Sequence, residues 1–122
     1  PPRPVRASNS LAPVEELLRR GVRVVLGTDN VRDVFFPLGD GSLLREAYVL
    51  AVGRRLILRE ELRALVRMAT VWGAEHLGLD YGLEPGRRAD LVALRAADEA
   101  ELLNAPGPEA VIFGGRVLVE PC

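Results

Sequence analysis

The chain has 122 residues, 48% of them hydrophobic, which is typical of one globular domain that buries roughly two thirds of its unfolded surface. Its 16 basic and 17 acidic residues nearly balance, so neither nucleic acid nor an anionic membrane is an expected partner. All the basic residues are arginine, which excludes lysine Schiff-base chemistry, and the single cysteine, Cys122, excludes an internal disulfide. A cytoplasmic protein with a small neutral substrate or a protein partner is therefore expected, and a homo-oligomer stays open.

The first part of the chain predicts a helix followed by a strand. From Ser10 the apolar residues recur at helical spacing, Pro13 suits a first turn, and Gly21 marks the stop. The segment VRVVLG, residues 22–27, is almost continuously apolar and predicts a strand buried on both faces of a parallel sheet. Because this order is typical of an alternating α/β unit, Asp29 is expected at the carboxyl end of that strand.

Two further helices are predicted in the middle of the chain. The first begins behind Asp40 or Ser42 as its N-cap. Its buried face is expected to consist of Leu43, Ala47, Leu50 and Ala51. The second is expected to run without interruption, with one apolar face made of Leu62, Leu65, Val66, Ala69 and Gly73.

The last part of the chain changes to a period of two, which is typical of strands. ADLVAL, residues 89–94, predicts one strand, and AVIF and RVLV predict two more. The pair Gly114 and Gly115 between these two suits a primed hairpin turn. We therefore expect two units, residues 1–79 of α/β type and residues 80–122 of β type.

Two segments resemble one family of enzymes. LGTDNVRDVFFPLGDGSLL, residues 26–44, is similar to the segment that closes the barrel in cytosine deaminase-like members of the metal-dependent amidohydrolase superfamily. MATVWGAEHLGLDYGLEPGRRADLVAL, residues 68–94, resembles the C-terminal signature of the same superfamily. The resemblance implies an α/β fold class, namely the C-terminal fragment of a (β/α)8 barrel of the TIM type with part of a small flanking β-sandwich.

By this resemblance, Asp29 follows the eighth strand, approaches the metal, and carries a proton from the metal-bound water to the leaving amine. From the residues alone, a turn or helix-cap role for this aspartate stays as the alternative. The implied reaction is hydrolytic deamination or cleavage of a cyclic amidine or amide, such as cytosine or an aminotriazine. The implied partner is thus a small heterocyclic substrate.

Three neighbours of Asp29 are candidates for the same site. Asn30 stands where relatives often carry a second acid, and it either bonds a ring nitrogen or exocyclic group of the substrate or serves as a turn residue. Phe35 falls at or near an aromatic position that lies over the pyrimidine, with a core position as the alternative. Asp33 is expected to shape the loop, paired with Arg32.

The metal implied by the resemblance is zinc or iron, held mainly by histidines of an H-x-H pair and of the middle strands. This chain has one histidine, His76, which lacks a partner at helical spacing and is expected on a helix surface or in packing. Asp90 is expected to fix the turn after Gly86. The chain alone is therefore expected to bind no metal tightly and to be inactive, and a non-catalytic α+β module for folding or oligomerisation is the competing hypothesis.

Overall fold

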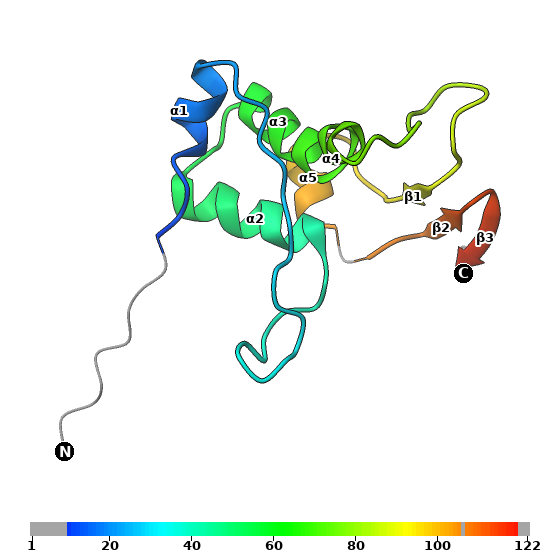
Figure 1. Ribbon diagram of the computed structural model, residues 1–122, viewed down its shortest axis with the longest axis horizontal. Coiled ribbons are helices and arrows are strands. Elements are labelled where there is room, and N and C mark those ends of the chain that lie inside the picture. The colour runs from blue at the N-terminus through cyan, green and yellow to red at the C-terminus, as the bar shows by residue number, and fades with distance from the viewer. Residues whose placement is uncertain (1–9, 106, 120–122) are drawn as a thin grey trace.

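The computed structural model describes residues 10–105 and 107–119. Helices gather on one side and a small sheet lies on the other (Figure 1). The helices are α1 (Val14–Arg19), α2 (Leu43–Arg54), α3 (Arg59–Ala69), α4 (Val71–His76) and α5 (Glu99–Leu103). The strands are β1 (Leu91–Ala93), β2 (Ala110–Phe113) and β3 (Arg116–Val119). Within the described residues, no helix is long and apolar enough to cross a membrane.

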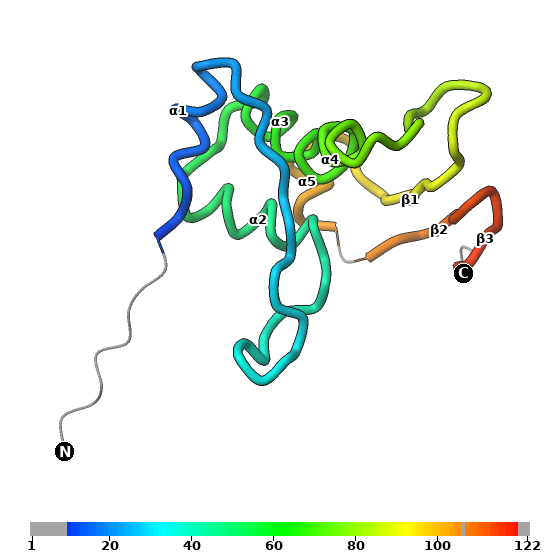
Figure 2. The backbone as a smooth tube through the Cα atoms, in the orientation of Figure 1, coloured from blue at the N-terminus to red at the C-terminus, as the bar shows by residue number. Residues whose placement is uncertain are grey.

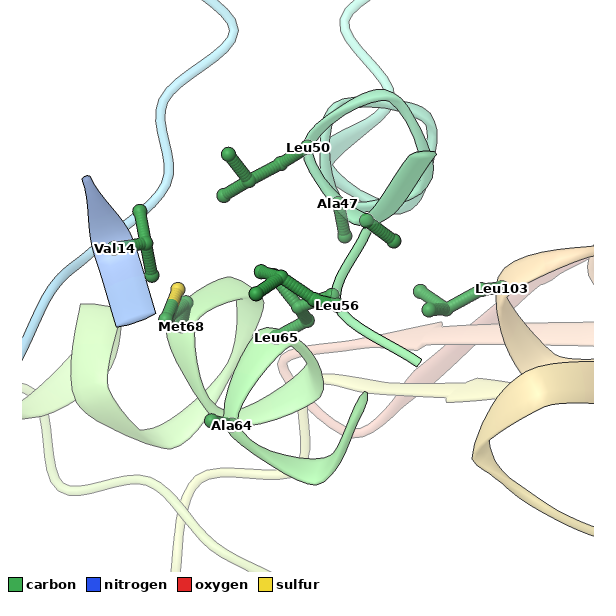
Figure 3. Packing of buried hydrophobic residues seen from close by; sticks show 9 residues of the cluster. Val14, Ala47, Leu50, Leu56, Ala64, Leu65, Met68 and Leu103 are labelled. Carbon is green, nitrogen blue, oxygen red and sulfur yellow. The ribbon is translucent and has the colours of Figure 1, made fainter. Parts of the chain in front are cut away.

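The hydrophobic core lies where α2 and α3 face each other, and α1 and α5 close its sides (Figure 3). Leu65 is 0% exposed, and Leu56, in the connection between α2 and α3, also points into this cluster. The cluster consists of Val14, Ala47, Leu50, Ala51, Leu56, Ala64, Leu65, Met68 and Leu103. Of the four residues predicted for the buried face of α2, Ala47, Leu50 and Ala51 belong to this cluster, whereas Leu43 is only partly buried.

The start of α2 is defined by two side chains that accept main-chain hydrogen bonds. Ser42 is the N-cap, and its hydroxyl accepts from the Arg45 N–H at 3.3 Å. The Asp40 carboxylate accepts from the Ser42 N–H at 3.0 Å and forms an ion pair with Arg45. Of the two residues predicted as caps, Ser42 therefore takes that role, and Asp40 fixes the approach to it.

The predicted strand at residues 22–27 is not formed. The segment is extended, but no strand pairs with it within the described residues, where the three strands pair only with one another. Val24 and Leu26 pack against the core, while Val22 and Val25 stay exposed, so one face is covered rather than two. A main-chain bond holds it instead: the Leu26 N–H donates to the Met68 carbonyl at 3.3 Å.

The predicted second helix of the middle region is divided into α3 and α4 at Thr70. This residue has φ −130° and ψ −100°, outside the helical range, and its hydroxyl donates to the Val66 carbonyl at 2.7 Å. A threonine hydroxyl that bonds back to the preceding turn favours such a bend. The break leaves the Met68 carbonyl available to the Leu26 N–H, so it also helps to hold the segment that leads to Asp29.

The sheet is antiparallel, with the order β1-β2-β3. Leu91 pairs with Ile112 across β1 and β2, and Phe113 pairs with Arg116 across β2 and β3. Gly114 and Gly115 have φ of 55° and 77°, the two positive values that a type I′ hairpin turn requires, so the predicted hairpin is confirmed. Helix α5 was not expected from the sequence. Its Leu103 packs into the core between the helices.

Asp90 links the start of β1 to the β2–β3 turn. Its carboxylate accepts from the Gly114 N–H at 2.6 Å and forms an ion pair with Arg88. The Arg88 guanidinium in turn lies 5.2 Å from the centre of the Phe113 ring, a cation–π distance. Asp90 thus fixes the β2–β3 turn, in addition to the turn after Gly86 that the sequence suggested.

Candidate active-site loop

Asp29 lies at the end of the extended segment, immediately before a loop of residues 30–39. The loop leaves the helical body and returns on itself before α2 (Figure 2). Asp29 is exposed and has a φ of 50°, in the left-handed region that Asp and Asn enter more readily than most residues. The main chain thus turns sharply at the residue predicted to be catalytic.

Asp33 is the centre of the hydrogen bonds inside this loop. One carboxylate oxygen, Oδ1, accepts from the Phe35 N–H at 2.8 Å and from the Phe36 N–H at 3.0 Å. The other, Oδ2, accepts from Asn30 Nδ2 at 2.7 Å. The expected pairing with Arg32 is wrong, since none of the ion pairs in the described chain joins these neighbours; Asp33 instead bonds Asn30 and the loop main chain.

The same bonds set the electrostatics of Asp33. Its pKa is lowered from the ordinary value of 3.8, chiefly because Asn30 donates to the charged carboxylate, and then because the Phe36 and Phe35 N–H groups do so. The carboxylate is therefore charged at neutral pH. A charged carboxylate makes stronger bonds to these donors than its neutral form does.

Gly39 closes the loop, although the sequence did not predict a role for it. It is buried, and a Cβ built on it would lie 2.0 Å from the Asn30 carbonyl oxygen and 3.1 Å from the carbonyl carbon. Main-chain atoms cannot yield as a flexible side chain can, so only glycine fits at this neck. The available sequence signal was the glycine in PLGDG, between an apolar run and the cap of α2.

The apolar residues of the loop face solvent rather than the core. Phe35 is 86% exposed and Val34 is 93% exposed, and Leu38 is also largely exposed. The alternative that Phe35 is a core residue is therefore wrong for the described part of this chain. An exposed aromatic ring beside two polar residues is a suitable surface for a planar ligand.

The residues present do not form a metal centre by themselves. Within residues 10–105 and 107–119, no group of three or more His, Cys, Asp or Glu side chains gathers in a way that could hold an ion. His76 is the exposed last residue of α4, as expected of a surface histidine. Asp29 is one carboxylate, whereas a catalytic zinc takes three protein ligands, so the described chain does not fit a complete site.

A separate cleft of about 770 Å³ lies between the helices and the sheet. It runs from the start of α2 past the end of α3 to β1 and α5, and its lining includes Tyr48, Thr70 and Val92. None of the loop residues 29–39 lines it. This cleft is thus distinct from the candidate site.

The amidohydrolase family matches residues 2–119 of the chain. The chain is 32% identical over 111 residues to N-isopropylammelide isopropyl amidohydrolase of Pseudomonas sp. (strain ADP), an alignment covering 88% of this chain and 28% of the relative. It is 40% identical over 135 residues to 5-methylthioadenosine/S-adenosylhomocysteine deaminase of Pelotomaculum thermopropionicum, covering 95% and 30%. The chain therefore spans less than a third of the length of these relatives.

Two solved structures share its fold. N-isopropylammelide isopropylaminohydrolase from Burkholderia multivorans superposes with a TM-score of 0.80 at 32% identity, over 88% of this chain and 28% of that one. The 5-methylcytosine deaminase from Klebsiella pneumoniae superposes with a TM-score of 0.78 at 29% identity, over 89% and 27%. The relatives are hydrolases and deaminases that act on C–N bonds. With a family match over nearly its whole length, the chain belongs to the amidohydrolase family.

Proposed function

We propose that this chain is the C-terminal part of a longer, metal-dependent amidohydrolase that deaminates a cyclic amidine or cleaves a cyclic amide, such as cytosine or an aminotriazine. This proposal rests on the family match over residues 2–119. The matched segment includes Asp29, Asn30 and the loop that Asp33 organises. Residues 1–79 then contribute the last segments of a (β/α)8 barrel, and residues 80–122 contribute part of the flanking β-sandwich.

In this reaction, a water oxygen bonds to the ring carbon and the C–N bond to the leaving amine breaks. Asp29 accepts the proton that the water loses and delivers it to the amine nitrogen, so that the amine leaves neutral. Its position at a sharp main-chain turn, exposed and beside the loop, supports this role. Asn30 bonds the polar edge of the substrate, and the Phe35 ring stacks on its face.

The divalent metal, zinc or iron, supplies an activated water in the complete enzyme. The histidine ligands of the metal lie outside this chain. Asp29 is the one carboxylate that this chain contributes near the metal. The 122-residue chain alone is then inactive. Titration with zinc tests this: we expect no site with a sub-micromolar Kd, on the order of −8 kcal/mol or better. Tight binding of one zinc with release of ammonia from cytosine contradicts it.

The direct test is Asp29→Asn in the complete enzyme. Loss of the proton carrier lowers turnover by about 10² or more, as is typical of general acid–base groups. The matched control is Asp80→Asn, which removes the charge of an exposed aspartate paired with Arg87, far from the loop in sequence. Turnover of Asp29→Asn within about threefold of the parent overturns the catalytic role of Asp29.

A further inference from the structure

The hydrogen bond between Asn30 and Asp33 determines which end of the Asn30 amide is free. An amide has an NH₂ end that donates and a carbonyl end that accepts, whereas a charged carboxylate only accepts. The 2.7 Å contact with Asp33 Oδ2 must therefore be made by Nδ2 of Asn30. No group in the described residues donates to the other end, Asn30 Oδ1, which stays available as an acceptor.

Both partners of this bond are held in place. Asp33 cannot rotate freely, because its Oδ1 accepts from two consecutive main-chain N–H groups, those of Phe35 and Phe36. The main chain of Asn30 is also held, because Gly39 packs against the Asn30 carbonyl. Asn30 is half-buried at this neck. The orientation of its amide is thus set before any ligand arrives.

We infer that Asp33 is a positioning residue that fixes the polarity of Asn30, and that the site selects planar heterocycles presenting an N–H donor, rather than a bare ring nitrogen, to residue 30. This inference rests on the proposed function and deepens it. A lactam or amino tautomer supplies such a donor to Oδ1. A ring nitrogen with a lone pair meets another lone pair and leaves both groups without a partner.

The variant Asp33→Asn tests the inference because it changes polarity at constant shape. The oxygen of the new amide keeps the two N–H groups of Phe35 and Phe36, so its NH₂ group faces Asn30. Two NH₂ groups cannot bond, and Asn30 must turn its carbonyl toward residue 33. Its NH₂ group then faces the ligand, and the selectivity reverses.

The probes are pyrimidinone, which presents a ring N–H, and methoxypyrimidine, whose corresponding ring nitrogen only accepts. Their Kd values are measured by calorimetry on the complete enzyme and its variants. In the parent, pyrimidinone binds about tenfold more tightly; in Asp33→Asn, the ratio shifts by tenfold or more toward methoxypyrimidine. The matched control is Asp90→Asn. The Asp90 carboxylate also accepts a main-chain N–H, but it lies outside the loop, so this variant leaves the ratio unchanged.

A second variant keeps the test decisive if Asp33→Asn fails to fold. Asn30→Leu removes the acceptor, and the ratio of the two Kd values falls to about one; a ratio that persists overturns the inference. An unchanged ratio in folded Asp33→Asn overturns it as well, while a loss of turnover in Asp29→Asn still supports the proposed function. If the parent binds neither probe and Asp29→Asn keeps its turnover, both fail.

Discussion

The α2–α3 body and the loop at residues 30–39 hold their shapes by different means. In the body, apolar side chains from two facing helices exclude water, and no polar or charged residue is buried there. In the loop, the apolar side chains point to solvent, and the shape comes from one carboxylate, its three donors and one glycine. The loop can therefore be altered chemically without removing the packing that folds the chain.

The largest expected effect breaks the body. Leu65→Ala empties a fully buried position between α2 and α3 and lowers the free energy of unfolding by about 2–5 kcal/mol, from lost burial and the remaining cavity. Urea denaturation measures this. Leu38→Ala, the same change at a largely exposed loop residue, is the control and stays within about 0.5 kcal/mol. Equal costs at both positions would show that the loop is packed as the body is.

The next largest effect on stability is expected at Gly39, at the neck of the loop. Gly39→Ala places a Cβ against the Asn30 carbonyl, and the overpacking costs roughly 1–3 kcal/mol or opens the loop. Faster hydrogen exchange at the Phe35 and Phe36 amides reports the opening. Gly27→Ala is the matched control, because a Cβ there meets nothing within 4 Å. Unchanged exchange in Gly39→Ala would contradict the close approach.

The smallest expected effect is a pH dependence of the loop that the α2–α3 body does not share. Asp33 has a pKa lowered from 3.8 by hydrogen bonds, so the stability it adds to the loop is fully present above 3.8 and is lost as the pH falls through the lowered pKa. The Phe35 and Phe36 amide resonances should shift in that acid range, before the core unfolds. Asp33→Asn, which has no carboxylate, should abolish the shift; its persistence would assign the titration to another group.

Features that depend on neighbours in the sequence could be predicted from the sequence. The buried face of α2, its Ser42 cap and the Gly114–Gly115 turn each need only local spacing and residue type. The strand at 22–27 could not be judged so, because an apolar run shows a tendency to pair but not whether a partner is present. The break at Thr70 depends on one hydroxyl inside a regular helical pattern.

The candidate site shows the same division. The Asn30 to Asp33 spacing is a local signal, and an aspartate accepting from the N–H two residues on is a known turn pattern, so a loop-shaping role was open to prediction. Its pairing with Arg32 was predicted from charge alone, which does not account for the stronger competition of main-chain donors. The role of Gly39 requires knowing that residues 30 and 39 meet in space.

The bond between the Leu26 N–H and the Met68 carbonyl has a consequence for how the site can be mapped. It joins main-chain atoms only, so any residue except proline at position 26 can make it, and it places no demand on side-chain identity. Alanine scanning and alignments both read side chains, and both pass over such a link. A main-chain hydrogen bond therefore connects the α3–α4 break to the segment before Asp29, although no side chain in the sequence reveals it.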